Sequence, residues 1–283
     1  MTTRLPRRLF VPRPFLKWVG GKGQLLNELL AQVDRAGKLH RYHEPFLGGG
    51  ALFFELVRTG RMPAAKAILS DNNANLIAVY RGVREDVDRV IALLLEHKRK
   101  HSEPHYYDVR AMNPKDDIEQ AARIIYLNKT GYNGLYRENS QGKYNVPFGR
   151  YKNPGICDED NLRAVAKALQ RAKLEVRHFA KVLDCVEAGD FVYFDPPYHP
   201  VSKTASFTSY DKGGFGEDGQ RQLAKVAEGL DARGVRVVLS NSMTPLIREL
   251  YAKFTIDEVF ANRNVNSRAD RRGKISEALI RNF

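Results

Sequence analysis

The sequence has little cysteine and no long apolar run. Its 283 residues include two cysteines, Cys157 and Cys185, which form neither a disulfide framework nor the spacing of a metal site, so we expect ordinary packing residues. No apolar run approaches the roughly 20 residues that a membrane-spanning helix needs. Residues 1–13 carry four arginines but no apolar core of a signal peptide. We therefore expect a cytoplasmic protein without a membrane partner.

Histidines with the spacing of a metal site are also few. His97 and His101 lie four residues apart on a predicted helix, which suits a pair of metal ligands. Pro104 breaks that helix before His105, and no carboxylate or cysteine completes the set. We expect no bound metal.

The composition is that of a globular protein with a polyanionic partner. With 43% hydrophobic and 10% aromatic residues, the chain can fill the core of one large α/β domain plus an insertion. Its net charge of +13 indicates a partner such as nucleic acid. The basic residues concentrate in three stretches, residues 4–22, 129–152 and 263–281.

One apolar segment ends in an unusual set of side chains. Residues 191–198 read Phe-Val-Tyr-Phe-Asp-Pro-Pro-Tyr. The first four have the length of a buried parallel strand, and the two prolines cannot continue its ladder, which puts Asp195 at the strand's carboxyl end. Ligands of open α/β sheets bind at that edge. The alternative interpretation is an ordinary strand followed by a Pro-Pro turn.

These residue types suit the methylation of an amino group on a base. The lone pair of an exocyclic amino group is delocalised into the ring, so the nitrogen needs acceptors that pull on its hydrogens. The Asp195 carboxylate and the Pro196 carbonyl are two acceptors on a stiff backbone. Tyr198 offers a face on which a base taken out of a duplex could stack.

A glycine-rich turn further upstream suits a nucleoside cofactor. Residues 43–50 read His-Glu-Pro-Phe-Leu-Gly-Gly-Gly and lead from a short strand into a helix, and a second strand, residues 67–71, ends at Asp71, twenty-one residues after Gly50. That acid is placed to bind a ribose diol. The glycines do not match Gly-x-Gly-x-x-Gly, and bulky residues follow them. S-adenosylmethionine, which has no phosphate, therefore fits better than a dinucleotide.

The middle basic stretch alternates aromatic rings and cations within a glycine-rich loop. Residues 129–152 hold five basic residues and one acidic residue. Cations can hold phosphates while rings stack or wedge between bases. Arg137 is a candidate reader of guanine, since arginine can bind its major-groove edge with two hydrogen bonds. The alternative is a simple hairpin with solvated charges.

The periodicity predicts alternating strands and helices around one long helical stretch. Helices are expected at 24–33, 51–58, 159–171, 220–230 and 245–252, and continuous helical pattern at 73–128. After the first two strands, further strands are expected at 174–176, 191–194, 235–240, 255–260 and 278–283, the last two forming a hairpin. This order implies an α/β protein with a mainly parallel sheet and a helical insertion.

Six motifs, taken in order, closely resemble those of the D12-class (Dam-type) DNA adenine N6-methyltransferases of the alpha group. They are Lys17-Trp18-x-Gly-Gly-Lys22, Glu-Pro-Phe46-x-Gly-Gly-Gly, Asp71, Tyr132-Asn-Gly-Leu-x-Arg137, Asn-Val-Pro147-x-Gly-Arg-Tyr151 and Asp195-Pro-Pro-Tyr198. The resemblance implies a Rossmann-like class I methyltransferase fold, with a seven-stranded sheet whose last strand is antiparallel. It also implies a catalytic domain at 1–73 and 158–283, with a helical target-recognition insertion at 74–157.

The resemblance also implies roles by position. The residues expected at the S-adenosylmethionine cofactor are Trp18, Lys22, Phe46, Gly48, Gly50, Asp71, Asn72, Phe179 and Asp195. The catalytic residues expected at a flipped adenine are Asp195, Pro196, Pro197 and Tyr198. The expected DNA contacts are Lys17, Tyr132, Asn133, Leu135, Arg137, Pro147 and Tyr151, to which we add Lys129. The Asn-Gly-Leu-x-Arg element goes with recognition of GATC in double-stranded DNA.

The sequence departs from the family pattern at one position, and it also allows other functions. Relatives commonly carry an acid before the phenylalanine that follows the third strand, whereas this chain has His178 before Phe179. An N4-cytosine DNA methyltransferase, an RNA or protein-amide methyltransferase, and a DNA-binding module without catalysis are the alternatives. The expected enzyme is a monomer that serves a restriction-modification system, with a cognate endonuclease as genetic partner, or that marks DNA alone.

Overall fold

The computed structural model describes residues 11–18, 20, 22–23, 25–62, 67–201, 215–262 and 274–283. About half of the first basic stretch and most of the third lie outside the described residues. Among the described helices, none is long and apolar enough to cross a membrane.

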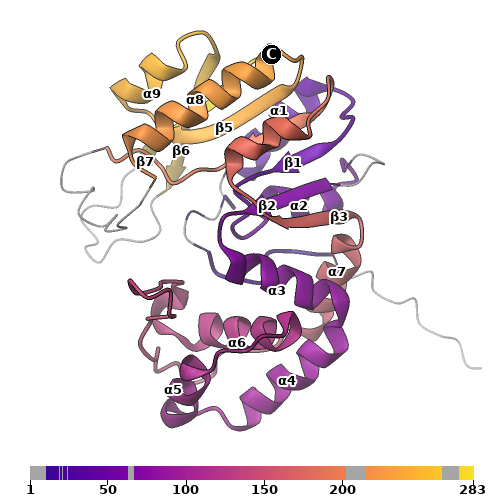
Figure 1. Cartoon of the computed structure of the whole chain (residues 1–283), viewed down its shortest axis with the longest axis vertical. Coiled ribbons are helices and arrows are strands. Elements are labelled where there is room, and N and C mark those ends of the chain that lie inside the picture. Colours follow the sequence, from indigo (N-terminus) through magenta and orange to yellow (C-terminus); the bar gives the residue numbers. More distant parts are fainter. Residues whose placement is uncertain are drawn as a thin grey trace, which may run out of the picture.

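A seven-stranded sheet in the described chain carries the upper part of the molecule (Figure 1). Its strands are β1 (Tyr42–Glu44), β2 (Ala67–Asp71), β3 (Ala172–Val176), β4 (Phe191–Phe194), β5 (Arg236–Ser242), β6 (Thr255–Asn262) and β7 (Lys274–Arg281). Their order is β3-β2-β1-β4-β5-β7-β6. The pairs among β1 to β5 are parallel, and β7 runs antiparallel to both β5 and β6. The predicted mainly parallel sheet with an antiparallel last strand is confirmed.

Helices cover both faces of this sheet, because its buried strands are apolar on both sides. In β4, Phe191 and Tyr193 join one core cluster, whereas Val192 and Phe194 join the other. This follows from the alternation of side chains along a strand. Helices α1 (Leu26–Ala36), α2 (Ala51–Arg58) and α7 (Glu159–Leu169) bury their apolar sides in the first cluster, and α8 (Glu217–Asp231) and α9 (Pro245–Leu250) in the second.

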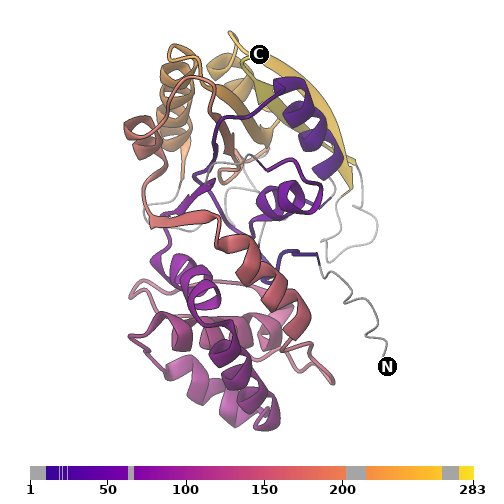
Figure 2. The same ribbon diagram turned by 90° about the vertical axis from the view of Figure 1, so that its right-hand side faces the viewer.

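Four consecutive helices follow β2 and form the lower part of the molecule (Figures 1 and 2). They are α3 (Ala74–Glu85), α4 (Val87–Arg99), α5 (Glu103–Ala111) and α6 (Asp117–Thr130). Each begins at a capping side chain that accepts a backbone N–H, namely Asn73, Asp86, Ser102 and Asp116. α3 contacts α6 on one side and β2, β3 and α7 on the other, so it joins the helices to the sheet.

The loop after α6 folds as a hairpin. A short 3-10 helix, η1 (Tyr132–Gly134), turns the chain. Antiparallel bridges then pair Glu138 with Tyr144 and Gly131 with Phe148. We call residues 131–151 the recognition hairpin. The hairpin interpretation is therefore right about the backbone, and the structure places its cations and rings as described below.

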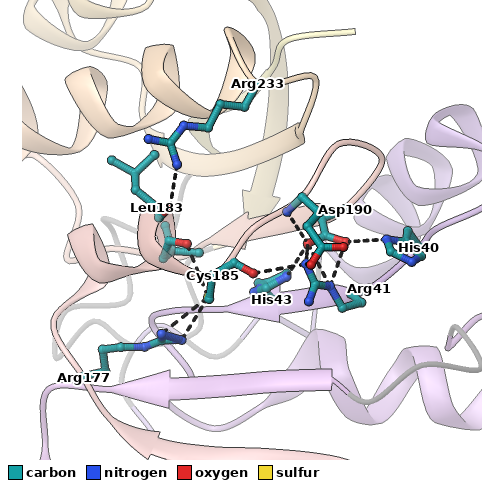
Figure 3. Close-up of polar contacts among 10 residues, drawn as sticks. His40, Arg41, His43, Arg177, Leu183, Cys185, Asp190 and Arg233 are labelled. Carbon is teal, nitrogen blue, oxygen red and sulfur yellow. Dashed lines mark hydrogen bonds and ion pairs between the residues drawn. The ribbon is translucent and has the colours of Figure 1, made fainter.

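A buried carboxylate ties together the amino-terminal ends of β1 and β4, opposite the edge that holds Asp195 (Figure 3). Asp190 is fully buried and accepts hydrogen bonds from Arg41 Nη2 at 2.8 Å and His43 Nε2 at 3.0 Å. Its other oxygen lies 3.1 Å from His40 Nδ1. Burial opposes ionisation, but the bonds from Arg41, the Glu187 backbone N–H and His43 outweigh it and lower the pKa of Asp190. The network fixes where these two strands start.

Candidate active site

The sequence motifs meet at the carboxyl edge of three adjacent strands. Phe46 follows β1, Asp71 ends β2 and Asp195 follows β4, and β1 lies between the other two strands in the sheet. Parallel strands end at the same edge, so the three motifs converge although up to 149 residues separate them.

Asp195 lies at the centre of a small charged cluster. Lys22 Nζ is 2.7 Å from Asp195 Oδ1, donates to the Gly20 carbonyl at 2.7 Å, and lies 4.5 Å from the centroid of the Tyr198 ring. The Tyr198 hydroxyl donates to Glu277 Oε2 at 2.8 Å. The cluster places the Asp195 carboxylate and the Tyr198 ring against the same ammonium group.

Burial controls the ionisation of this carboxylate. Removal from water raises the pKa of Asp195 to about 6, with Lys22 opposing the rise and Glu277 adding to it. Asp195 is therefore ionised at neutral pH and remains a strong acceptor. A carboxylate has about four acceptor positions, so the bond to Lys22 leaves capacity for another donor.

The loop after β4 is held by two buried polar side chains that the sequence analysis missed. Gln220 on α8 donates through Nε2 to the Pro197 carbonyl at 2.9 Å. Asn241 on β5 accepts from the His199 backbone N–H at 2.9 Å and donates to Gln220 Oε1 at 2.9 Å. Both are fully buried. Of the two prolines, Pro196 is buried and Pro197 is exposed.

The glycine-rich turn after β1 binds back to the end of β2. Asp71 Oδ2 accepts from the Gly48 N–H at 3.1 Å, and Asp71 Oδ1 accepts from the Asn73 N–H at 2.9 Å. Burial raises the pKa of Asp71, although these backbone bonds favour its charged form. Gly48 and Gly50 have positive φ of 47° and 65°, which L side chains rarely adopt. Asn72, beside them, is exposed.

Trp18 packs directly on that turn. A Cβ added at Gly48 would lie 3.0 Å from Trp18 Cδ1, so a side chain there would displace the indole. The indole packs against the Tyr136 ring, with 4.9 Å between the ring centroids and an interplanar angle of 31°. The predicted cofactor residues Trp18 and Gly48 are thus in contact.

An aromatic cluster lines the same edge of the sheet. Phe46 stacks on Phe179 at 5.2 Å between centroids and meets Phe215 edge to face at 5.5 Å. Phe215 precedes α8 and was missed, because nothing in its local sequence marks it. His178 packs on Phe179, and its Nδ1 accepts from the Ala180 N–H at 3.3 Å. The histidine that departs from the family pattern therefore caps η2 (Phe179–Asp184).

A second buried carboxyl, also missed, lies on β1. Glu44 is 2% exposed and accepts from the Tyr42 hydroxyl at 2.8 Å. Burial raises the pKa of Glu44 to about 8, and the charge of Asp195 contributes to the rise. Glu44 is therefore largely protonated at neutral pH.

The residues expected to contact DNA lie on the recognition hairpin and beside it. Most of them are exposed: Lys17, Tyr132, Asn133, Arg137, Pro147 and Tyr151. Leu135 and Lys129 are half-buried. Burial, with help from Lys17, lowers the pKa of Lys129. The Arg137 guanidinium donates to the Asn145 carbonyl at 2.8 and 3.2 Å, which orients it across the hairpin.

The strand order and the Asp-Pro-Pro-Tyr end of β4, together with the glycine turn after β1, define a protein of the α/β methyltransferase class. A family model described as D12 class N6 adenine-specific DNA methyltransferase matches residues 18–265. The chain is 44% identical to the Type II methyltransferase M.MjaIII of Methanocaldococcus jannaschii, covering 96% of this chain and 99% of that protein. It is 41% identical to the Type II methyltransferase M1.LlaDCHI of Lactococcus lactis subsp. cremoris, covering 96% and 95%.

A third relative is the DNA adenine methylase of Escherichia coli strain K12, 35% identical over 94% of each chain. The chain belongs to the D12 class of N6 adenine-specific DNA methyltransferases. The predicted enzyme class, an adenine-specific DNA methyltransferase, is confirmed.

Proposed function

We propose that this enzyme transfers a methyl group from S-adenosylmethionine to N6 of an adenine rotated out of duplex DNA, within the sequence GATC. The observation that carries the proposal is the convergence of Asp195 and Tyr198 with the Gly48 turn and Asp71 at one edge of the sheet.

The glycine turn and its surroundings fit the cofactor. The lack of a side chain at Gly48 and Gly50 lets Trp18 and the Tyr80 hydroxyl pack closely on the turn, since an added Cβ would lie 3.0 Å from each. Asp71 supplies a carboxylate for ribose hydroxyls, and the Phe46 ring supplies an apolar face for an adenine ring. When bound, S-adenosylmethionine supplies a methyl group on a sulfonium, which is an activated leaving group.

Asp195 activates the target nitrogen in this proposal. Its carboxylate accepts one N6 hydrogen and the Pro196 carbonyl accepts the other, which turns the nitrogen lone pair toward the methyl group. Positive charge that develops on N6 is stabilised by the Asp195 carboxylate, which the buried loop holds in place. Asp195 then takes the proton that N6 must lose.

Tyr198 and Tyr132 offset the cost of removing the base. Flipping costs a few kcal/mol, and stacking on an aromatic ring contributes about 1–3 kcal/mol for each base. Tyr198 provides the ring beside Asp195. Tyr132 is 53% exposed at the tip of η1, which suits insertion into the duplex that the adenine vacates.

The recognition hairpin supports duplex DNA as the substrate and GATC as its sequence. Arg137 is exposed and oriented by the Asn145 carbonyl, as a guanine reader requires. We propose residues 74–157 as the target-recognition unit and the monomer as the active form. We further propose that the enzyme serves a restriction-modification system or marks DNA alone; its relatives include Type II methyltransferases and a DNA adenine methylase.

Methyl transfer to matched duplexes tests the proposal. Duplexes that differ only in GATC or GATG are incubated with labelled S-adenosylmethionine and the wild-type enzyme, Asp195→Ala, or Asp184→Ala. Asp184 is an exposed carboxylate paired with Lys181, so it controls for the loss of one negative charge. We expect label on adenine N6 in GATC alone, lost in Asp195→Ala and kept in Asp184→Ala.

Each other result changes a different part of the proposal. Label in both duplexes would remove the sequence assignment and keep the chemistry. Label on cytosine would move the target to N4 of that base. Full activity of Asp195→Ala would remove Asp195 from catalysis.

A further inference from the structure

Two buried asparagines hold the amino-terminal segment, residues 11–18, in the same way. Asn161 on α7 accepts from the Arg13 N–H at 3.0 Å and donates to the Arg13 carbonyl at 3.1 Å. Asn128 on α6 accepts from the Lys17 N–H at 2.7 Å and donates to the Lys17 carbonyl at 2.9 Å. Each side-chain amide thus bonds both the N–H and the carbonyl of one residue, as a neighbouring β-strand would. Figure 2 shows this segment between the sheet and the helical part.

The Asn128 side chain makes a third hydrogen bond, for which the Asn161 side chain has no counterpart. Its Nδ2 also donates to the Gly134 carbonyl at 3.0 Å, so the turn of the recognition hairpin is held by the same amide as Lys17. Asn128 is fully buried, and these three bonds use its acceptor and both of its donors.

Lys17 packs onto the recognition hairpin as a result. A Cβ added at Gly134 would lie 2.3 Å from Lys17 Cδ, so the lysine stem occupies the space that this glycine leaves. The Lys17 ammonium lies 5.4 Å from the centroid of the Tyr151 ring. The position of this charge therefore depends on where the Lys17 backbone is held.

The next residue contacts the other side of the site. Trp18 lies on the Gly48 and Gly49 turn and packs against Tyr136 of the recognition hairpin. Adjacent Cα atoms are about 3.8 Å apart, so the Lys17 backbone does not move without moving Trp18. One dipeptide thus joins the glycine turn to the hairpin, and Asn128 fixes its place.

We propose that Asn128 is a positioning residue that couples the glycine turn, where the cofactor binds, to the recognition of the DNA target. The inference rests on the proposed function, since it takes the glycine turn as the cofactor wall and the hairpin as the DNA reader. Asn128 touches neither ligand in this account. It sets the distance between Trp18 on one and Lys17 on the other.

Coupling of this kind is reciprocal. A cofactor analogue that orders Trp18 also orders Lys17, so it tightens DNA binding, and DNA tightens binding of the analogue by the same factor. Such factors are typically about 5- to 150-fold. Without the Asn128 amide the two sites should bind their ligands independently.

The test compares Asn128→Ala and Asn128→Asp with Asn161→Ala. Asn161 is the matched control, because it is a buried asparagine with the same pair of bonds to the same segment, four residues upstream. Asn128→Asp keeps the size of the side chain and loses both donors, which covers the case in which the alanine protein fails to fold. Thermal unfolding identifies folded variants.

Two quantities are measured for each protein. One is the dissociation constant for a GATC duplex with and without saturating S-adenosylhomocysteine. The other is the ratio of methylation rates on GATC and on a duplex with one altered flanking base pair. We expect a roughly tenfold or greater tightening by S-adenosylhomocysteine in the wild type and in Asn161→Ala, and a factor near one in both Asn128 variants. The rate ratio should fall in parallel.

A purely structural role would lower the stability of Asn128→Ala and Asn161→Ala alike and leave the coupling factor unchanged. That result would overturn the inference, as would a wild-type protein whose affinity for the duplex does not respond to S-adenosylhomocysteine. Failure of the proposed function is recognised separately, because the wild-type enzyme would then place no label on adenine in any duplex.

Discussion

At the scale of single residues, the proposed reaction requires a carboxylate that is half-buried and still charged. Burial raises the pKa of Asp195 to about 6, and the ammonium of Lys22, 2.7 Å away, opposes the rise. A protonated Asp195 has a hydrogen where the N6 hydrogen of the target must be accepted. We therefore expect kcat to fall as the pH drops through about 6.

The substitution Lys22→Met should shift the pH dependence of kcat in a predictable direction. Loss of the ammonium leaves burial and Glu277 unopposed, so the pKa of Asp195 rises and the acid limb of the kcat profile moves to higher pH. The measurement is the pH of half-maximal kcat at saturating cofactor, which is independent of the height of the profile. A matched control is Lys181→Met, whose ammonium pairs with exposed Asp184. An unmoved or lowered midpoint in Lys22→Met would contradict this account.

Residues of the site differ in how far the sequence reveals them. Asp195 and Asp71 can be predicted from the sequence, because each ends an apolar strand and parallel strands place such ends at one edge of the sheet. Gln220 and Asn241 are not, since each resembles any polar residue until the fold brings it against the loop after β4. Asn128 is hidden for the same reason, because its partners Lys17 and Gly134 come from different segments.

At the scale of elements, the close contact of α3 and α6 depends on one glycine. A Cβ added at Gly82 would lie 2.3 Å from the Asp117 carbonyl oxygen and 2.9 Å from the Ala121 Cβ. Backbone atoms cannot step aside as a flexible side chain does, so the two helices must separate.

Gly82→Ala should therefore destabilise the protein, although alanine is the better helix former. The strain of overpacking, about 1–3 kcal/mol, exceeds the gain in helix propensity of about 1 kcal/mol. Gly229 in α8 is the matched control: its added Cβ would make an ordinary contact, 3.4 Å from Leu183 Cδ2. Gly229→Ala should stabilise by about 0.5–1 kcal/mol. Urea unfolding midpoints measure both, and equal shifts would refute the packing argument.

The elements themselves were largely predictable, and the differences have local causes. The helix that carries His97 ends before Pro104, as expected, but it already ends at Arg99, so His101 lies outside it. Pro104 lies in the first turn of the next helix, α5, where the missing N–H costs nothing. β7 was expected at 278–283 and spans Lys274–Arg281, because its pairing with β6 extends to Asn262. Hydrogen bonding to the neighbouring strand extends β7 beyond its apolar residues, and the hydrophobic periodicity of the local sequence does not reveal that pairing.

At the scale of the whole molecule, alternating strands and helices predicted an α/β protein, but they do not fix the strand order. That order implies a crossover from β3 at one edge to β4 in the middle, which only the resemblance to a known family suggested. Placement of the recognition hairpin relative to the sheet likewise depends on contacts that α3 makes on both sides.

The net charge of +13 also acts at this scale, and its effect on DNA binding depends on where each charge lies. A cation that contacts a phosphate releases a counterion, so the slope of log K against log salt concentration reports the number of such contacts. Lys152, exposed just after the recognition hairpin, should be one of them. Lys152→Ala should lower the slope by about one unit.

Lys253→Ala is the control, since it removes the same charge from a side chain that lies after α9 and pairs with Glu228. We expect its slope to match the wild type, because a charge without a phosphate partner releases no counterion on binding. Affinity for a GATC duplex measured at several salt concentrations decides the point. If both variants lower the slope equally, the attraction arises from total charge, and the hairpin loses its special role in holding the DNA backbone.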